Sequence, residues 1–159
     1  MSITHYMELL MTNQPWNLII YMAIPVILAE ALVATEFFVV HTHQNTGTLR
    51  TVNKWLGVVA GIYFLGIFLN LITNVVPGIE WRGWVDVVAV GFYLSGVIPL
   101  VSIALIELGV LGRGRSDMDR MKLHFIFLTV FLVVAHIAMI FGMVSPELVQ
   151  AASPAMPMM

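Results

Sequence analysis

The stretch LHFIFLTVFLVVAHIAMIFGMV, residues 123–144, contains no aspartate, glutamate, lysine or arginine. A helix that crosses a bilayer needs about 20 mainly apolar residues, so this stretch is long enough to span one. Three comparable stretches precede it along the chain. The four expected spans cover residues 17–41, 55–76, 84–111 and 122–144, which is most of the 159-residue sequence.

The composition agrees with a membrane protein. The chain is 60% hydrophobic and only 10% charged, whereas soluble domains carry about 25% charged residues. The apolar stretches lack the alternating pattern of barrel strands, and helices satisfy their own backbone groups in hydrocarbon. We therefore expect a single all-α integral membrane domain, residues 1–159, folded as an antiparallel bundle of four transmembrane helices. Short amphipathic helices are expected at its outer ends, over residues 2–11 and after Ser145.

The basic residues predict how the bundle is oriented. Six of them fall in two connections, Arg50 and Lys54 in loop 42–54 and Arg113, Arg115, Arg120 and Lys122 in loop 112–122. Positively charged loops face the cytoplasm. We expect these two loops to be cytoplasmic and both termini to lie outside a cell inner or plasma membrane.

Several classes of function are excluded or disfavoured. The chain has no cysteine, so thiolate metal sites and thiol redox chemistry are absent. The net charge of −2 offers no basic surface for nucleic acid. No serine–histidine–acid arrangement or phosphate-binding glycine loop is recognisable, so an enzyme acting by itself is not expected. The expected partners are the lipid bilayer and either other membrane subunits or further copies of the chain.

Ionisable residues inside the expected spans are the strongest functional signal, because a charge at membrane depth is costly and usually functional. With a rise of about 1.5 Å per residue, they form three cross-helix pairs from the cytoplasmic edge inward: His41 with His124, Glu36 with Glu107, and Glu30 with His136.

These pairs leave three kinds of site open. His41 or His43 with His124 could supply both axial ligands of a b-type haem. Glu36, Glu107 and His124 could instead bind a transition metal such as iron, manganese or zinc, although the Glu-x-x-His spacing of bundle di-iron proteins is absent.

The third possibility is a proton route in which Glu30, His136 and Asn70 form the mid-membrane part. A site of this kind can also serve a quinone. Each possibility competes with a plain packing role for the same polar groups.

The function expected from these residues is that of a small subunit of a membrane redox or electron-transfer assembly, holding a haem, a metal or a quinol and proton site near the cytoplasmic face. The alternatives are an oligomeric cation- or proton-coupled permease and a structural subunit of a membrane complex. The sequence does not choose among the cofactors.

Overall fold

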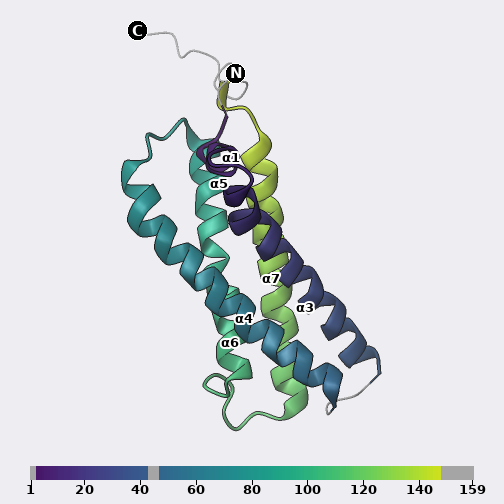
Figure 1. The fold of residues 1–159 in the computed structure, drawn as a ribbon. Coiled ribbons are helices and arrows are strands. Elements are labelled where there is room, and N and C mark those ends of the chain that lie inside the picture. Colours follow the sequence, from purple (N-terminus) through teal and green to yellow (C-terminus); the bar gives the residue numbers. More distant parts are fainter. Residues whose placement is uncertain (1–2, 43–46, 148–159) are drawn as a thin grey trace.

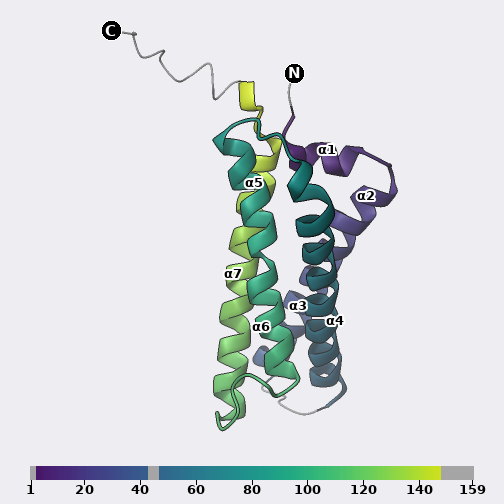
Figure 2. The same ribbon diagram turned by 90° about the vertical axis from the view of Figure 1, so that its left-hand side faces the viewer.

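The computed structural model describes residues 3–42 and 47–147, and all regular secondary structure within them is helical. Four helical segments are long and apolar enough to cross a membrane: Trp16–His41, Thr48–Gly78, Trp84–Glu107 and Asp117–Met143. They run antiparallel to their sequence neighbours as one bundle (Figures 1 and 2). The fold expected from the sequence is confirmed.

Each span is built from one or more elements. The first contains α2 (Trp16–Leu18), the π-helical turn η1 (Ile19–Ala23) and α3 (Ile24–His41). The second contains α4 (Thr48–Asn70), η2 (Leu71–Val75) and η3 (Val76–Gly78). The third contains α5 (Trp84–Ser95) and α6 (Val97–Glu107), and the fourth consists of α7 (Asp117–Met143). A short helix, α1 (His5–Met11), precedes them. The second expected end helix, after Ser145, falls mostly on residues outside those described, where only Pro146 and Glu147 are seen to be helical.

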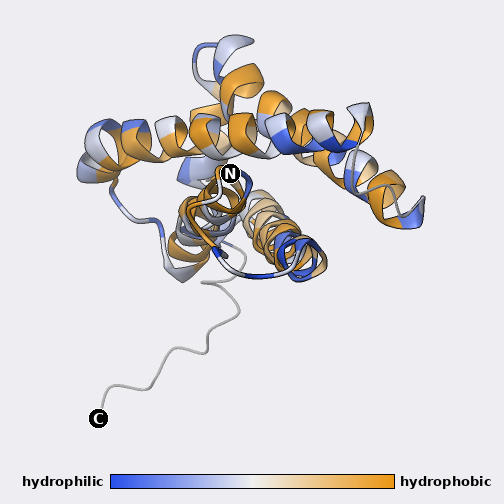
Figure 3. Cartoon of the chain, turned by 90° about the horizontal axis from the view of Figure 1, so that it is seen from below, coloured by the Kyte–Doolittle hydropathy of each residue, from blue (hydrophilic) through white to orange (hydrophobic). Residues whose placement is uncertain are grey.

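The two ends of the bundle differ, and we name them by what they carry. The α3–α4 and α6–α7 connections lie at one end, called here the loop end, and α1 with the α4–α5 connection lies at the other, called the terminal end (Figure 1). Between them the helices are hydrophobic over most of their surface (Figure 3). This surface matches the hydrocarbon layer of a bilayer.

At the loop end, the spans differ in length from those expected. α4 begins at Thr48 and α7 at Asp117, because helical hydrogen bonding continues past the apolar stretch into polar sequence. The Ser116 side chain caps α7 by accepting a hydrogen bond from the Asp119 amide, 3.2 Å away. The third span ends early, at Glu107, where Gly109 adopts the left-handed conformation (φ 74°) that terminates helices.

Two glycines let α4 and α6 approach closely. A Cβ built on Gly61 would lie 2.6 Å from both the Ala104 Cβ and the Leu100 carbonyl oxygen. A Cβ on Gly57 would lie 3.0 Å from Ile103 and 3.3 Å from the His124 Nε2 atom. The small-residue spacing of the second span is therefore a helix-packing motif.

Pro25 shapes the first span by removing a backbone donor. Without a proline N–H, Pro25 cannot donate to the carbonyl of Tyr21 four residues before it, nor to that of Ile20 five residues before it. Tyr63 from α4 donates its hydroxyl to Ile20 at 3.0 Å, and Tyr93 from α5 donates to Tyr21 at 2.7 Å. The irregular turn η1 is thus stabilised by two neighbouring helices.

Helix α1 docks against the terminal end of the bundle. The Thr4 side chain donates to the Gly142 carbonyl at 2.5 Å, and the Tyr6 ring packs on Tyr93 with centroids 5.2 Å apart. Burial raises the pKa of the Tyr6 hydroxyl above its ordinary value. This side chain therefore stays neutral across the physiological pH range.

Gly61→Ala should destabilise the bundle, because the backbone carbonyl of Leu100 cannot move aside as a flexible side chain would. We expect a loss of about 1–3 kcal/mol, the usual cost of overpacking, measured as reversible unfolding in a fixed detergent mixture. Gly66→Ala on the same helix is the matched control, since a Cβ there meets nothing within 4 Å. Equal stability of the two variants would contradict close α4–α6 packing.

Tyr93→Phe should leave the Tyr21 carbonyl without its partner inside the membrane. Interhelical hydrogen bonds of this kind contribute about 0.6–1.7 kcal/mol, so a fall in unfolding free energy of that size is expected. Tyr6→Phe serves as the control, since no hydrogen bond from its hydroxyl is found within residues 3–42 and 47–147. A fall of the same size in both variants would show that the freed carbonyl is not the cause.

Candidate functional site: a buried histidine between two carboxylates

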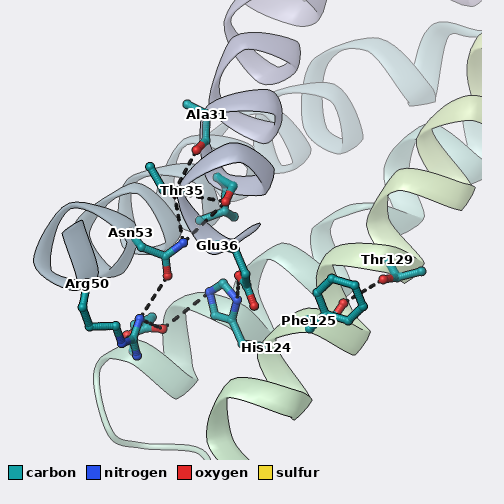
Figure 4. A network of polar contacts seen from close by, with 10 residues as sticks. Ala31, Thr35, Glu36, Arg50, Asn53, His124, Phe125 and Thr129 are labelled. Atoms are coloured by element: carbon teal, nitrogen blue, oxygen red, sulfur yellow. Dashed lines mark hydrogen bonds and ion pairs between the residues drawn. The ribbon is translucent and has the colours of Figure 1, made fainter. Parts of the chain in front are cut away.

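Three ionisable side chains from three helices meet inside the bundle near the loop end. His124 of α7 is 2% exposed and lies between Glu36 of α3 and Glu107 of α6, which are 2% and 3% exposed. The His124 Nδ1 atom contacts the Glu36 Oε2 atom, and its Nε2 atom lies 3.5 Å from Glu107 Oε1. Figure 4 shows the imidazole ring with a carboxylate at each nitrogen. The sequence predicted all three residues as site candidates, and the fold brings them together.

Arg50 fixes the carboxylate of Glu107. Its two terminal nitrogens each donate to one Glu107 oxygen at 2.9 Å, the planar two-point geometry that guanidinium groups favour. The same arginine donates to the side-chain oxygen of Asn53 at 3.0 Å. Asn53 in turn donates to the Thr35 hydroxyl at 3.0 Å. The chain of contacts runs from α4 to α3 and holds both helices in register around His124 (Figure 4).

The charges of the four ionisable groups determine how many protons they hold. Arg50 and Glu107 form a neutral pair, so Glu36 and His124 must together be neutral to avoid a net charge in a medium of low dielectric constant. Two arrangements satisfy this condition. Either Glu36 is ionised and His124 is protonated at both nitrogens, or Glu36 carries the proton and His124 is neutral. Moving one proton between Glu36 and His124 would convert one arrangement into the other and leave the net charge unchanged.

The same geometry bears on metal binding. The two nitrogens of an imidazole point away from each other, so one ion cannot bind Glu36, His124 and Glu107 together in this arrangement. Both Glu107 oxygens are also engaged by Arg50. Within residues 3–42 and 47–147, no group of three or more His, Asp or Glu side chains is arranged to hold a metal ion. The metal site stays a prediction.

The histidine pair proposed for a haem is not assembled in the described residues. His41 is exposed at the end of α3, where its ring stacks on Phe37 with centroids 5.7 Å apart. Both nitrogens of His124 already face carboxylates, and His43 lies outside the described residues. The haem ligation by His41 or His43 with His124 remains a prediction that no observed contact supports.

The depth pairing expected from residue counting is shifted by more than a helical turn. Counting placed His41 opposite His124, but the residue that meets His124 is Glu36. α3 crosses α7 at an angle (Figure 1), whereas counting assumes parallel axes. From this contact, Glu30 lies about 9 Å further along α3, and His136 lies about 18 Å further along α7.

Glu30 and His136 both line a lateral cavity of about 180 Å³ on the terminal-end side of this cluster. The His136 Nδ1 atom lies 2.6 Å from the Leu132 carbonyl oxygen, which can only accept, so Nδ1 carries a proton and donates it. Asn70 lies beside the cavity, where its side-chain oxygen accepts a hydrogen bond from Tyr21 at 3.0 Å. Two of the three residues expected at mid-membrane therefore line one cavity, and Asn70 is connected to it through Tyr21.

Sequence reasoning missed two parts of the polar structure. Arg50 was interpreted only as a topogenic charge, although Asn53 at i+3 indicated a polar face on the extended α4. A second cluster lies at the terminal end, where the fully buried Asp86 accepts from the His5 amide at 2.7 Å and contacts the His5 ring at 2.5 Å. Nearby, Arg82 pairs with Glu8 at 2.5 Å. These contacts attach α1 to α5.

Comparison with known proteins identifies a family but no described relative. No curated protein matches the chain. No solved structure matches it either. Residues 1–158 match a family described as "Family of unknown function (DUF6803)". Because the match covers almost the whole sequence, the chain belongs to the DUF6803 family.

Proposed function

We propose that this protein is a proton-relay subunit of a membrane redox assembly, in which His124 passes a proton between Glu107 and Glu36. The observation that carries the proposal is the placement of a carboxylate at each nitrogen of a buried imidazole. A histidine held in this way accepts a proton at one nitrogen and releases another from the opposite nitrogen. A buried neutral imidazole that served only packing would need an acceptor for its N–H and a donor for its other nitrogen, whereas two ionised carboxylates offer acceptors at both nitrogens.

The orientation of the relay follows from the distribution of basic residues. The positive-inside rule places the loop end at the cytoplasm. His124 then lies about 10 Å along α7 from its first residue, in the cytoplasmic part of the membrane. Arg50 is the member of the cluster nearest to water, with 24% of its side chain exposed, so protons enter from the cytoplasmic side beside Arg50 and Glu107.

The route continues toward the middle of the membrane. Glu36 lies about 9 Å along α3 from Glu30, so a chain of several water molecules would have to carry the proton between them. Glu30 faces the lateral cavity together with His136. A proton delivered to this depth serves a reaction partner held within the bilayer, which is the setting of a redox assembly.

The permease alternative needs a second half of the route, from the cavity to the terminal end. There the wall of the cavity includes Tyr6 of α1, and α1 packs its buried Tyr6 and Leu10 side chains onto the bundle. A relay that ends at mid-membrane fits this arrangement better than a pathway through the whole bilayer.

The proton shared by Glu36 and His124 can be observed directly. Infrared difference spectra recorded across a pH titration should contain a carboxylic-acid band from Glu36, which Glu36→Gln removes. His124→Gln should shift this band, because the proposal has the Glu36 Oε2 and His124 Nδ1 atoms share one proton. His41→Gln is the matched control, since it replaces an exposed histidine at the end of α3. A band unaffected by His124→Gln would show that the two residues do not share a proton.

Transfer along the relay can be measured as the rate at which the same carboxylic-acid band shifts when the purified protein is moved from water into deuterium oxide. His124→Gln should slow this exchange by roughly tenfold or more, in line with the usual contribution of a positioned acid–base group, while His41→Gln leaves it unchanged. The absorption spectrum and metal content of the same preparation provide a second check. A Soret band lost in His124→Ala, or stoichiometric bound metal, would replace the relay with a cofactor site.

A further inference from the structure

A cavity between α3, α5 and α7 adjoins the inner end of the relay. Its lining from the first span repeats every three or four residues from Met22 of η1 to Glu30 of α3, and its lining from α7 repeats in the same way from Phe131 to Met139. Glu30 and His136 are exposed rather than buried, so the cavity is open at its side toward the bilayer. A ligand would enter from the lipid phase.

Aromatic rings form much of the wall. Phe64 lies between Tyr93 and Phe131, with centroid separations of 5.5 Å and 5.7 Å. Tyr6, Tyr21 and Phe92 complete the aromatic lining. Walls of this kind favour a flat ring over a flexible acyl chain, because aromatic pairs gain about 0.5–1.5 kcal/mol from stacked or edge contacts beyond burial itself.

Two polar groups distinguish this cavity from a plain lipid groove. Since the His136 Nδ1 atom donates to Leu132, the Nε2 atom of the neutral ring is left as an acceptor for a hydroxyl group. Glu30 has no hydrogen-bond partner among residues 3–42 and 47–147. An acidic side chain at mid-membrane is costly by about 2.5–3.5 kcal/mol when charged, and a ligand oxygen that bonds to it offsets this cost.

From these features we propose that the cavity binds a lipid-soluble quinone or quinol, with its ring against Phe64, Tyr93 and Phe131 and its ring oxygens toward Glu30 and His136. The class follows from three requirements that it meets together: entry from lipid, a flat ring, and oxygens that accept or donate hydrogen bonds. The inference rests on the proposed function in one respect: when a redox partner in the assembly supplies two electrons, the bound quinone takes up two protons from the relay and becomes the quinol. Binding itself requires only the cavity.

The test uses the purified full-length protein in nanodiscs of a single phospholipid, titrated with radiolabelled decylubiquinone. Ala135→Phe places a bulky ring in the cavity wall and should weaken binding by about tenfold or more, equivalent to about 1.4 kcal/mol. Val133→Phe makes the same change on the same helix at a side chain that is 54% exposed and outside the cavity lining. It should bind as the unmodified protein does.

Further variants keep the test decisive if Ala135→Phe does not fold. Glu30→Gln and His136→Phe alter the polar groups and should each weaken binding severalfold without filling the cavity. A photoreactive azidoquinone should label peptides of α3 and α7, and decylubiquinone should compete with this labelling. Absence of saturable binding to the folded protein, equal binding by Ala135→Phe and Val133→Phe, or displacement of the quinone by fatty acid would overturn the proposal.

The relay and the quinone site can fail separately. Glu36→Gln removes the shared proton but lies outside the cavity lining, so quinone affinity should stay within about twofold of the unmodified protein. Quinone binding together with an unchanged infrared band in His124→Gln would retain the cavity assignment and reject the relay. An infrared band that shifts in His124→Gln, together with no saturable quinone binding, would retain the relay and reject the quinone site.

Discussion

The requirement that buried charges sum to zero governs the loop end of this bundle. Arg50 and Glu107 neutralise each other, and Glu36 with His124 must therefore hold one proton between them. The four groups lie on four different helices: Glu36 on α3, Arg50 on α4, Glu107 on α6 and His124 on α7. Their electrostatic contacts therefore also hold these helices together. Removing one member would leave an uncompensated charge in a medium where it costs several kcal/mol. The stability of the bundle and the proposed proton exchange thus depend on the same contacts.

Close backbone packing makes these contacts possible. Gly57 lies opposite His124, and any side chain at that position would press on the ring. The hydroxyls of Tyr63 and Tyr93 satisfy the carbonyls that Pro25 leaves free, so the first span can be irregular where it passes the cavity. The buried polar groups therefore depend on their packing surroundings: Gly57 leaves room for the His124 ring, and the two tyrosine hydroxyls satisfy the backbone near Pro25.

Hydropathy was sufficient to predict the four spans, because a bilayer demands about 20 apolar residues from any helix that crosses it. The helix ends were less predictable, since α4 and α7 extend into polar sequence where side chains such as Arg50 and Ser116 find partners. Glu36, Glu107 and His124 were predicted as site residues from their depth. His41 was placed opposite His124 only because residue counting ignores the angle between α3 and α7. Asp86 gave no signal, because an acidic residue in the first turn of a helix is common.

The attachment of α1 also constrains the order in which the molecule can be built. Thr4 bonds to a carbonyl 138 positions later in the chain, and His5 bonds to a carboxylate 81 positions later. Contacts of such long sequence separation form only after the intervening chain has been synthesised. Helix α1 therefore reaches its final place only after α7 has been made. In a chain halted after three spans His5 and Asp86 are both present, but the Gly142 carbonyl that accepts from Thr4 is missing, so only part of the attachment of α1 is available.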